Sequence, residues 1–261
     1  SATLNGRPLD VSGWTGEGGL VLPDLSAENV LVVEAVGTYM NTGEGLHRFV
    51  DPVDGAVYLY TQFETADAKR MYACFDQPDL KAAFTFRVTA PGDWQVVTNG
   101  APVDAAPLEH GARWHAFATT ARMSTYVTAL VAGPYHVARD HHDGIDLGIL
   151  CRASLAEFLD AERLFTETKQ GFDFFHGIFG VRYPFGKYDQ LFVPEFNAGA
   201  MENAGAVTFR EEYVFRSKVT RYLYERRCET ILHEMAHMWF GDLVTMRWWD
   251  DLWLNESFAT W

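Results

Sequence analysis

Hydrophobic and polar residues alternate in short runs through the first half of the chain. These runs are rich in Val, Tyr, Phe and Thr, and turn residues such as Pro91-Gly92-Asp93 and Asn99-Gly100 separate them. Short strands at regular spacing, without long helices between them, are typical of an antiparallel sandwich. The predicted strands cover residues 29–36, 56–64, 82–90, 94–98, 113–119, 125–132 and 135–139.

The pattern changes to helical spacing after a polar stretch at residues 140–144. Long helices are predicted at 154–175 and from about 217 to 240, and a third begins near Asp251. Ser154 and Glu157 have the spacing of a capping box, and Gly241 is a stop signal for the second helix. The expected fold class is α+β, with an antiparallel, sandwich-like β domain at 1–142 and an α/β domain at 143–261.

Composition excludes several classes of protein. The 261 residues include 21 Lys and Arg against 35 Asp and Glu, a net charge of −14, which disfavours nucleic-acid partners. A hydrophobic content of 48% excludes disorder, and no apolar run reaches the roughly 20 residues of a membrane helix. Three scattered cysteines predict buried thiols in a reducing cytoplasm. The chain ends inside an amphipathic pattern and lacks an initial Met, so we expect a piece of a longer protein.

The strongest chemical motif is His233-Glu234-Met235-Ala236-His237, inside the second predicted helix. Residues i and i+4 share one helix face, so His233 and His237 can bind one metal ion. Glu234 lies beside the first histidine and can act as the general base for a metal-bound water without being a ligand. Taken alone, the pentapeptide also fits a chance match on an exposed helix.

A third ligand follows on the next predicted helix. Glu256 comes after eighteen intervening residues from His237, and a His, His, Glu set with one open position is typical of catalytic zinc. The alternative is a solvated carboxylate, which the neighbouring Leu254 and Phe258 disfavour. Carboxylates near the motif are expected to orient the imidazoles. The candidates are Glu229, Asp242, Asp250 and Asp251.

Together with Gly199-Ala200-Met201-Glu202-Asn203, the run from His233 to Glu256 resembles the aminopeptidase N family of zinc metallopeptidases, the gluzincins. The resemblance covers about residues 36–261 and looks closest to actinobacterial cytosolic members. Further motifs that carry it are Gln62-Phe63-Glu64, Phe75-Asp76-Gln77-Pro78-Asp79-Leu80-Lys81 and Met123-Ser124-Thr125-Tyr126.

The resemblance implies a thermolysin-like catalytic domain with one zinc ion, truncated after the third ligand, and peptide substrates with a free N-terminus. It assigns recognition of the substrate α-ammonium to Glu202 and Glu64. The other substrate-binding residues expected from the same motifs are Gln62, Gly199, Ala200, Met201 and Asn203. Family members also carry an oxyanion-binding Tyr further downstream, so the isolated chain is expected to be inactive.

Two alternatives stay open at this point. An epoxide-opening hydrolase of the leukotriene-hydrolase type shares the zinc site, but its loop normally has Gly where this chain has Ala200. A non-catalytic binding module on the same fold would be indicated by loss of Glu234 or a ligand, and all of these residues are present. Without the surrounding motifs, the Gly199–Asn203 loop would be an ordinary turn, and Gln62 and Glu64 would be polar strand residues.

Overall fold

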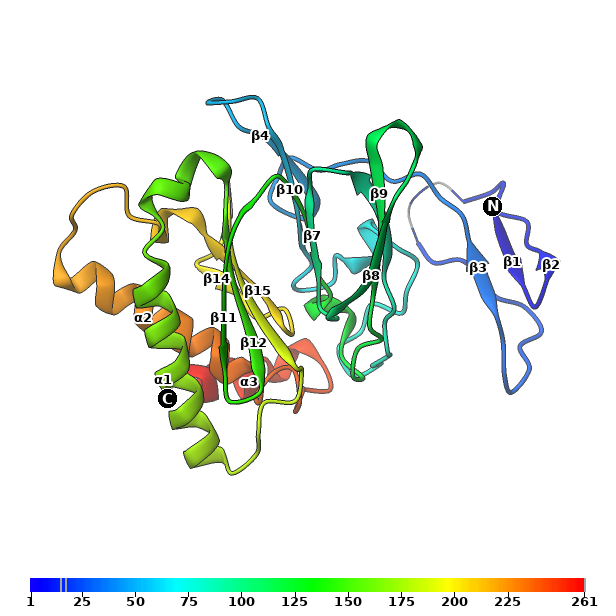
Figure 1. The fold of residues 1–261 in the computed structure, drawn as a ribbon. Helices are drawn as coiled ribbons and strands as arrows, with labels where there is room; N and C mark the ends of the chain where they lie inside the picture. The colour runs from blue at the N-terminus through cyan, green and yellow to red at the C-terminus, as the bar shows by residue number, and fades with distance from the viewer. Residues whose placement is uncertain (15, 17, 261) are drawn as a thin grey trace. The chain divides into compact units, whose positions relative to one another are not determined.

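The protein is described by a computed structural model that covers residues 1–14, 16 and 18–260 (Figure 1). The chain forms two compact units, Ser1–Thr38 and Tyr39–Trp261. The first unit contains a three-stranded antiparallel sheet in the order β2-β1-β3. Its strands are β1 (Ala2–Leu4), β2 (Arg7–Pro8) and β3 (Leu31–Val33), so the strand predicted at 29–36 is confirmed in shorter form.

The second unit begins with two antiparallel sheets, as the alternating pattern predicts. The four-stranded sheet has the order β4-β5-β10-β7, and the three-stranded sheet has the order β6-β9-β8. The strands are β4 (Gly45–Val50), β5 (Val57–Gln62), β6 (Arg87–Pro91), β7 (Gln95–Thr98), β8 (Pro102–Pro107), β9 (Ala112–Phe117) and β10 (Leu130–Gly133).

One predicted strand, 125–132, begins instead as a 3₁₀ turn at Thr125–Val127. The hydroxyl of Thr125 donates to Asp76, and that of Thr128 donates to the carbonyl of Thr125. Side-chain bonds of this kind offer the backbone an alternative to the sheet ladder, so the strand starts only at Leu130.

A five-stranded sheet in the order β11-β12-β13-β15-β14 forms the second half of this unit. The three central strands run parallel, and β11 and β14 are antiparallel edge strands. The elements are β11 (His136–His142), β12 (Ile145–Cys151), β13 (Lys187–Val193), β14 (Ala200–Met201), β15 (Ala206–Arg210), α1 (Ala161–Phe179), α2 (Arg221–His237) and α3 (Trp253–Thr260).

Both faces of the three parallel strands are buried, as is usual for such strands. On one face, Ile149 and Phe192 pack with residues of α1 and α2, such as Phe172 and Met235. On the other face, Leu191 joins a second core that includes residues of β5 and β10. The sheet therefore connects the helices that carry the motif to the antiparallel strands before it (Figure 1).

The capping box predicted at Ser154 is wrong. Residues Ala153–Phe158 form a 3₁₀ segment, and α1 begins only at Ala161. The Ser154 hydroxyl donates to the Asp51 carboxylate over 2.6 Å, and the Arg152 guanidinium binds the same carboxylate and that of Glu211. This buried ion network takes the hydroxyl away from the helix terminus.

The polar stretch at 140–144 lies in a hairpin between β11 and β12. Its turn residues, Asp143 and Gly144, have φ values of 52° and 82°, the left-handed conformation that such turns require. The strand before the turn thus joins the five-stranded sheet, and the division into domains at 1–142 and 143–261 stays a prediction. None of the described helices has the length and apolar character needed to cross a membrane, and the cytoplasmic location also stays a prediction.

Candidate metal centre and active site

The three predicted ligands converge at the end of α2. The Nε2 atoms of His233 and His237 are 3.0 Å apart, one helical turn from each other. Glu256 lies on α3. One of its carboxylate oxygens, Oε2, is 3.5 Å from Nε2 of His233, and the other, Oε1, is 3.7 Å from Nε2 of His237. One donor atom from each of the three residues can thus be chosen so that all three lie within 4.8 Å of one another.

This arrangement fits a zinc ion. Bonds of about 2.0–2.1 Å in a tetrahedral site place two ligand atoms about 3.3 Å apart, close to the three distances observed here. Nδ1 of His237 lies 2.9 Å from the carbonyl oxygen of Phe240, so it carries the proton and donates. Nε2 of His237 then keeps the lone pair that a metal needs. Burial, followed by the neighbouring His233, lowers the pKa of His237 and favours this neutral form.

The carboxylates that were expected to orient the imidazoles do not do so. Within the described part of the chain, no imidazole nitrogen of His233 or His237 is hydrogen-bonded to any of the four candidates. The Phe240 carbonyl orients His237, and the Thr260 hydroxyl lies 3.5 Å from Nδ1 of His233. The chain turns immediately after α2, and this brings a backbone carbonyl closer to the ring than any acidic side chain.

Glu234 and Glu202 lie beside the ligands and are buried, with exposures of 5% and 3%. One carboxylate oxygen of Glu202, one of Glu234 and one ring nitrogen of His237 all lie within 4.8 Å of one another. Burial, then the charges of Glu202 and Glu256, raise the pKa of Glu234 well above its ordinary value. Burial also raises the pKa of Glu202, to about 7. The general-base candidate and the signature glutamate therefore share one water-poor region.

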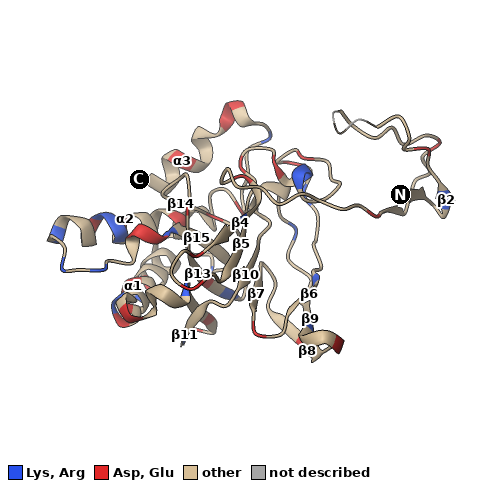
Figure 2. Cartoon of the chain, turned by 90° about the horizontal axis from the view of Figure 1, so that it is seen from above, with Lys and Arg blue, Asp and Glu red and all other residues tan. Residues whose placement is uncertain are grey.

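Glu64 adds a third carboxylate from just beyond β5. Burial, then Glu202 and Glu256, raise its pKa to about 8. No ion pair with Lys or Arg forms at Glu64, Glu202 or Glu234 among residues 1–14, 16 and 18–260. Figure 2 shows the basic residues of α2 in its first half, away from the motif. The site therefore concentrates negative charge without a basic partner, which favours binding of a cation.

The signature loop forms part of an edge strand. Ala200 and Met201 pair with Phe209 and Thr208 of β15, and the Gly199 carbonyl accepts from the Arg210 N–H. In the described part of the chain, no further strand pairs with the outer side of β14. The loop thus presents backbone groups next to the ligands.

Gln62 and Asn203, two further residues predicted for the site, make different contacts. The Gln62 amide lies 3.4 Å from the sulfur of Met201, so these two residues are brought together. Asn203 is buried, and its amide donates to the Thr208 hydroxyl. This contact indicates that Asn203 supports the loop from within the sheet.

Tyr126 belongs to the site, although sequence analysis gave it no role. Its hydroxyl accepts from the Asn255 amide over 3.2 Å. Burial raises the pKa of Glu202, and the nearby Tyr126 hydroxyl partly offsets this rise. Asn255 precedes the third ligand in the chain. The only sequence indication was that Tyr126 ends the segment Met123–Tyr126, which is one of the motifs carrying the resemblance.

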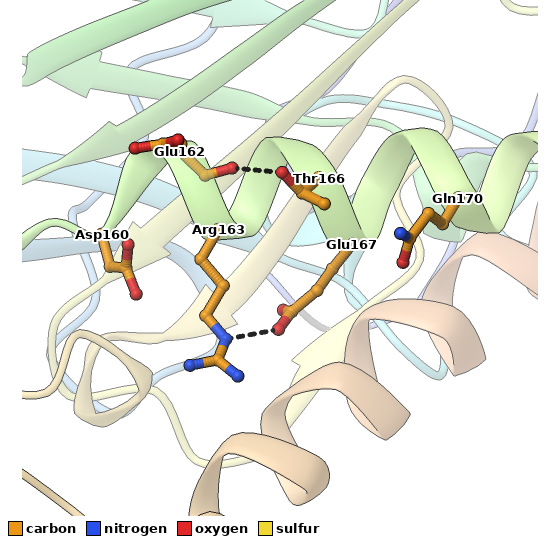
Figure 3. A pocket seen from close by; sticks show the side chains of 6 residues that line it. All are labelled: Asp160, Glu162, Arg163, Thr166, Glu167 and Gln170. Atoms are coloured by element: carbon orange, nitrogen blue, oxygen red, sulfur yellow. Dashed lines mark hydrogen bonds and ion pairs between the residues drawn. The ribbon is translucent and has the colours of Figure 1, made fainter.

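A separate hollow follows the exposed side of α1 (Figure 3). It is lined by Asp160, Glu162, Arg163, Thr166, Glu167 and Gln170. Arg163 and Glu167 pair across it at 3.0 Å. The hollow contains no predicted site residue, so the chemistry described above lies elsewhere.

Comparison with known proteins gives two family matches and several relatives. Residues 164–261 match the peptidase family M1 domain, and residues 24–127 match the peptidase M1 N-terminal domain. The chain is 59% identical to aminopeptidase N of Streptomyces lividans over 99% of its own length and 30% of that protein. It is 36% identical to aminopeptidase N of Acetobacter pasteurianus, covering 89% of the chain and 67% of that protein. Human aminopeptidase N is 38% identical over 78% of the chain and 22% of its own length.

Proposed function

The chain belongs to peptidase family M1, and we propose that it supplies the zinc-binding core of an aminopeptidase. The substrates are peptides with a free N-terminus, from which single residues are removed. The observation that carries this proposal is the convergence of His233, His237 and Glu256 beside the buried carboxylates of Glu202 and Glu234 and the half-buried carboxylate of Glu64. Because the chain spans 30% of the Streptomyces relative, the activity is proposed for the whole protein.

His233, His237 and Glu256 would hold one zinc ion. When bound, zinc polarises the scissile carbonyl and lowers the pKa of water to about 7, which makes a nucleophile available at neutral pH. Glu234 takes a proton from the attacking water on a carboxylate oxygen and passes it to the leaving amine. Its burial keeps bulk water from this transfer, so the proton stays with the reacting groups.

Glu202 and Glu64 bind the α-ammonium of the substrate. Two carboxylates with raised pKa values repel each other when both are ionised, and a cation placed between them removes that cost. The distance between these carboxylates and the ligands then limits cleavage to the first peptide bond. Binding and exopeptidase selectivity come from the same electrostatics.

The outer side of β14 positions the substrate backbone. An edge strand offers unpaired N–H and C=O groups that an extended peptide can join. Gly199 and Ala200 have little or no side chain, which lets the peptide come close. Met201 lies against Gln62, and we assign both to the wall of the pocket for the first side chain.

The test uses the intact protein, its zinc content and two matched chromogenic substrates, one with a free α-amine and one N-acetylated. We expect one zinc ion per chain and efficient cleavage of the free-amine substrate alone. Comparable cleavage of both substrates would show an endopeptidase-like site. Zinc binding with no cleavage of either would favour a non-catalytic binding module on the same fold. Opening of an epoxide substrate would favour the leukotriene-hydrolase type.

A further inference from the structure

Two motifs of the antiparallel part, apart from Tyr126, have no role in the proposed chemistry, and they are hydrogen-bonded to each other. They are the segments Phe75–Lys81 and Met123–Tyr126. The Ser124 hydroxyl donates to the Pro78 carbonyl over 2.5 Å, and the Thr125 hydroxyl donates to the Asp76 carboxylate over 2.9 Å. Just beyond Lys81, Ala82 and Met123 exchange two backbone hydrogen bonds of 3.1 and 3.0 Å. The paired segments therefore form one fixed support.

Lys81 extends from this support to the chain that follows α2. Its ammonium donates to the carbonyl oxygens of Asp242 and Leu243, over 2.7 and 3.2 Å. Hydrogen bonds from a charged donor are stronger than those between neutral groups. Lys81 is also partly buried, which limits competition from water.

The residues that Lys81 holds belong to a tight turn packed against His237. The Asp242 N–H donates to the His237 carbonyl over 3.0 Å, and the Gly241 N–H donates to the Val244 carbonyl over 2.7 Å. Gly241 has a φ of 138°, and a Cβ there would lie 3.2 Å from Nδ1 of His237. The turn thus approaches the imidazole so closely that a displacement of the backbone would move the ring.

The same turn supplies the acceptor that fixes the tautomer of His237. The Phe240 carbonyl lies 2.9 Å from Nδ1 and leaves Nε2 free to face His233 and Glu256. Second-sphere partners of this kind tune metal affinity, because they set both the orientation and the basicity of the ligand.

We propose that Lys81 is a positioning residue that holds the turn after α2, and through it the Phe240 carbonyl and the His237 ligand. The inference rests on the proposed zinc site. It assigns a function to the Phe75–Lys81 motif. This motif of the antiparallel part holds in place His237, a ligand that lies at the end of α2. Among the described residues, Lys81 forms no hydrogen bond or ion pair with a metal ligand or with Glu64, Glu202 or Glu234.

The experiment measures the zinc dissociation constant of the intact protein by competition with a chelator. The variants are Lys81→Met, which removes the donor, and Lys81→Arg, which keeps a charged donor. The control is Lys218→Met, which makes the same change in charge at an exposed site just before α2. We expect Lys81→Met to bind zinc about 10-fold more weakly, at the lower end of the range of about 10- to 100-fold for residues that support ligands.

Two further readouts separate positioning from general loss of stability. With zinc at saturation, Lys81→Met should lower kcat while KM stays near the wild-type value, because Lys81 is not part of the substrate site. Lys81→Arg should recover much of the zinc affinity. If Lys81→Met does not fold, Lys81→Gln, which keeps a shorter neutral donor, takes its place in the same measurements.

The outcomes are distinct. A wild-type protein that binds no zinc would remove the proposed function itself. If the wild type binds zinc and Lys81→Met binds it as tightly as Lys218→Met does, the positioning role is wrong and the proposed function stands. The same holds if Lys81→Met only shifts the unfolding midpoint and leaves zinc affinity and kcat unchanged.

Discussion

The ligand cluster and the carboxylate cluster lie side by side but are built in opposite ways. His233, His237 and Glu256 come from consecutive helices, and the glutamate faces two imidazoles. A hydrogen bond from His233 lowers the pKa of Glu256, against the effect of burial. Glu64, Glu202 and Glu234 come from three separate parts of the chain, and burial raises the pKa of each.

The difference shows how the negative charge of each cluster is offset. In the ligand cluster, the two imidazoles stabilise the Glu256 carboxylate before any ion binds. The protein can therefore preform this cluster. The buried carboxylates repel one another, and burying such groups costs free energy unless a cation or a proton offsets their charge. We infer that the first cluster is made to bind a resident metal and the second is made to bind a passing cation, the substrate ammonium.

The largest expected effect comes from the ligand cluster. His233→Ala removes one of three ligands, and we expect the purified protein to lose its zinc on dialysis against a chelator and to lose peptidase activity with it. Metal analysis of the dialysed protein measures this. His141→Ala, at an exposed histidine that pairs with Asp146, should keep zinc and activity. Full zinc occupancy in His233→Ala would contradict the ligand assignment.

Glu234→Gln tests whether the two clusters have separate roles. The amide has nearly the same shape but cannot accept the proton of water, so zinc should stay bound while kcat falls by at least about 100-fold. Glu229→Gln is the matched control, because Glu229 is an exposed residue of the same helix, paired with Arg226. Near-normal turnover in zinc-loaded Glu234→Gln would show that another group acts as the base.

The part of the site that is local in sequence could be predicted from the sequence. An i, i+4 pair on a helix meets on one face in any fold, so His233 and His237 required only a helix prediction. Glu256 required the further assumption that the next helix folds back, and the structure bears this out. The order of strands and helices followed for the same reason, because hydrophobic periodicity is a local property.

The contacts that depend on distant segments could not be predicted in this way. Lys81 meets Asp242 across 161 positions, and Tyr126 meets Asn255 across 129, so no spacing rule connects them. The capping box failed for a related reason: Asp51, far away in the sequence, takes the Ser154 hydroxyl. A backbone carbonyl, such as the one that orients His237, has no side-chain identity for a sequence to display.

Glu202→Ala tests the cation-binding role of the carboxylate cluster. Loss of a hydrogen bond to a charged group costs about 1.5–3 kcal/mol, so kcat/KM for free-amine peptides should fall by about 10- to 100-fold. Inhibitors that bind zinc and lack an α-amine should keep their affinity. Glu212→Ala, at an exposed carboxylate close to β15, is the control and should change neither. Equal weakening of both kinds of ligand would mean that Glu202 shapes the site without recognising the amine.

Tyr126→Phe has the smallest expected effect and tests the link between the two clusters. The Tyr126 hydroxyl is hydrogen-bonded to Asn255, the neighbour of the ligand Glu256, and lies near enough to Glu202 to lower its pKa. Removing the hydroxyl keeps the ring packed in the core and deletes only these interactions. A neutral hydrogen bond contributes about 0.5–1.5 kcal/mol, so we expect kcat/KM for free-amine peptides to fall by about 2- to 10-fold.

Whether zinc affinity falls together with peptide cleavage identifies which cluster depends on the hydroxyl. If Tyr126 mainly holds Glu202, the loss should appear for free-amine peptides, and zinc affinity should not change. If it mainly holds Asn255, zinc affinity should fall together with activity. Tyr222→Phe, on the exposed side of α2, removes a hydroxyl that faces solvent and should have no effect on either quantity. A Tyr126→Phe protein that matches Tyr222→Phe in both quantities would show that the Tyr126 hydroxyl contributes to neither cluster.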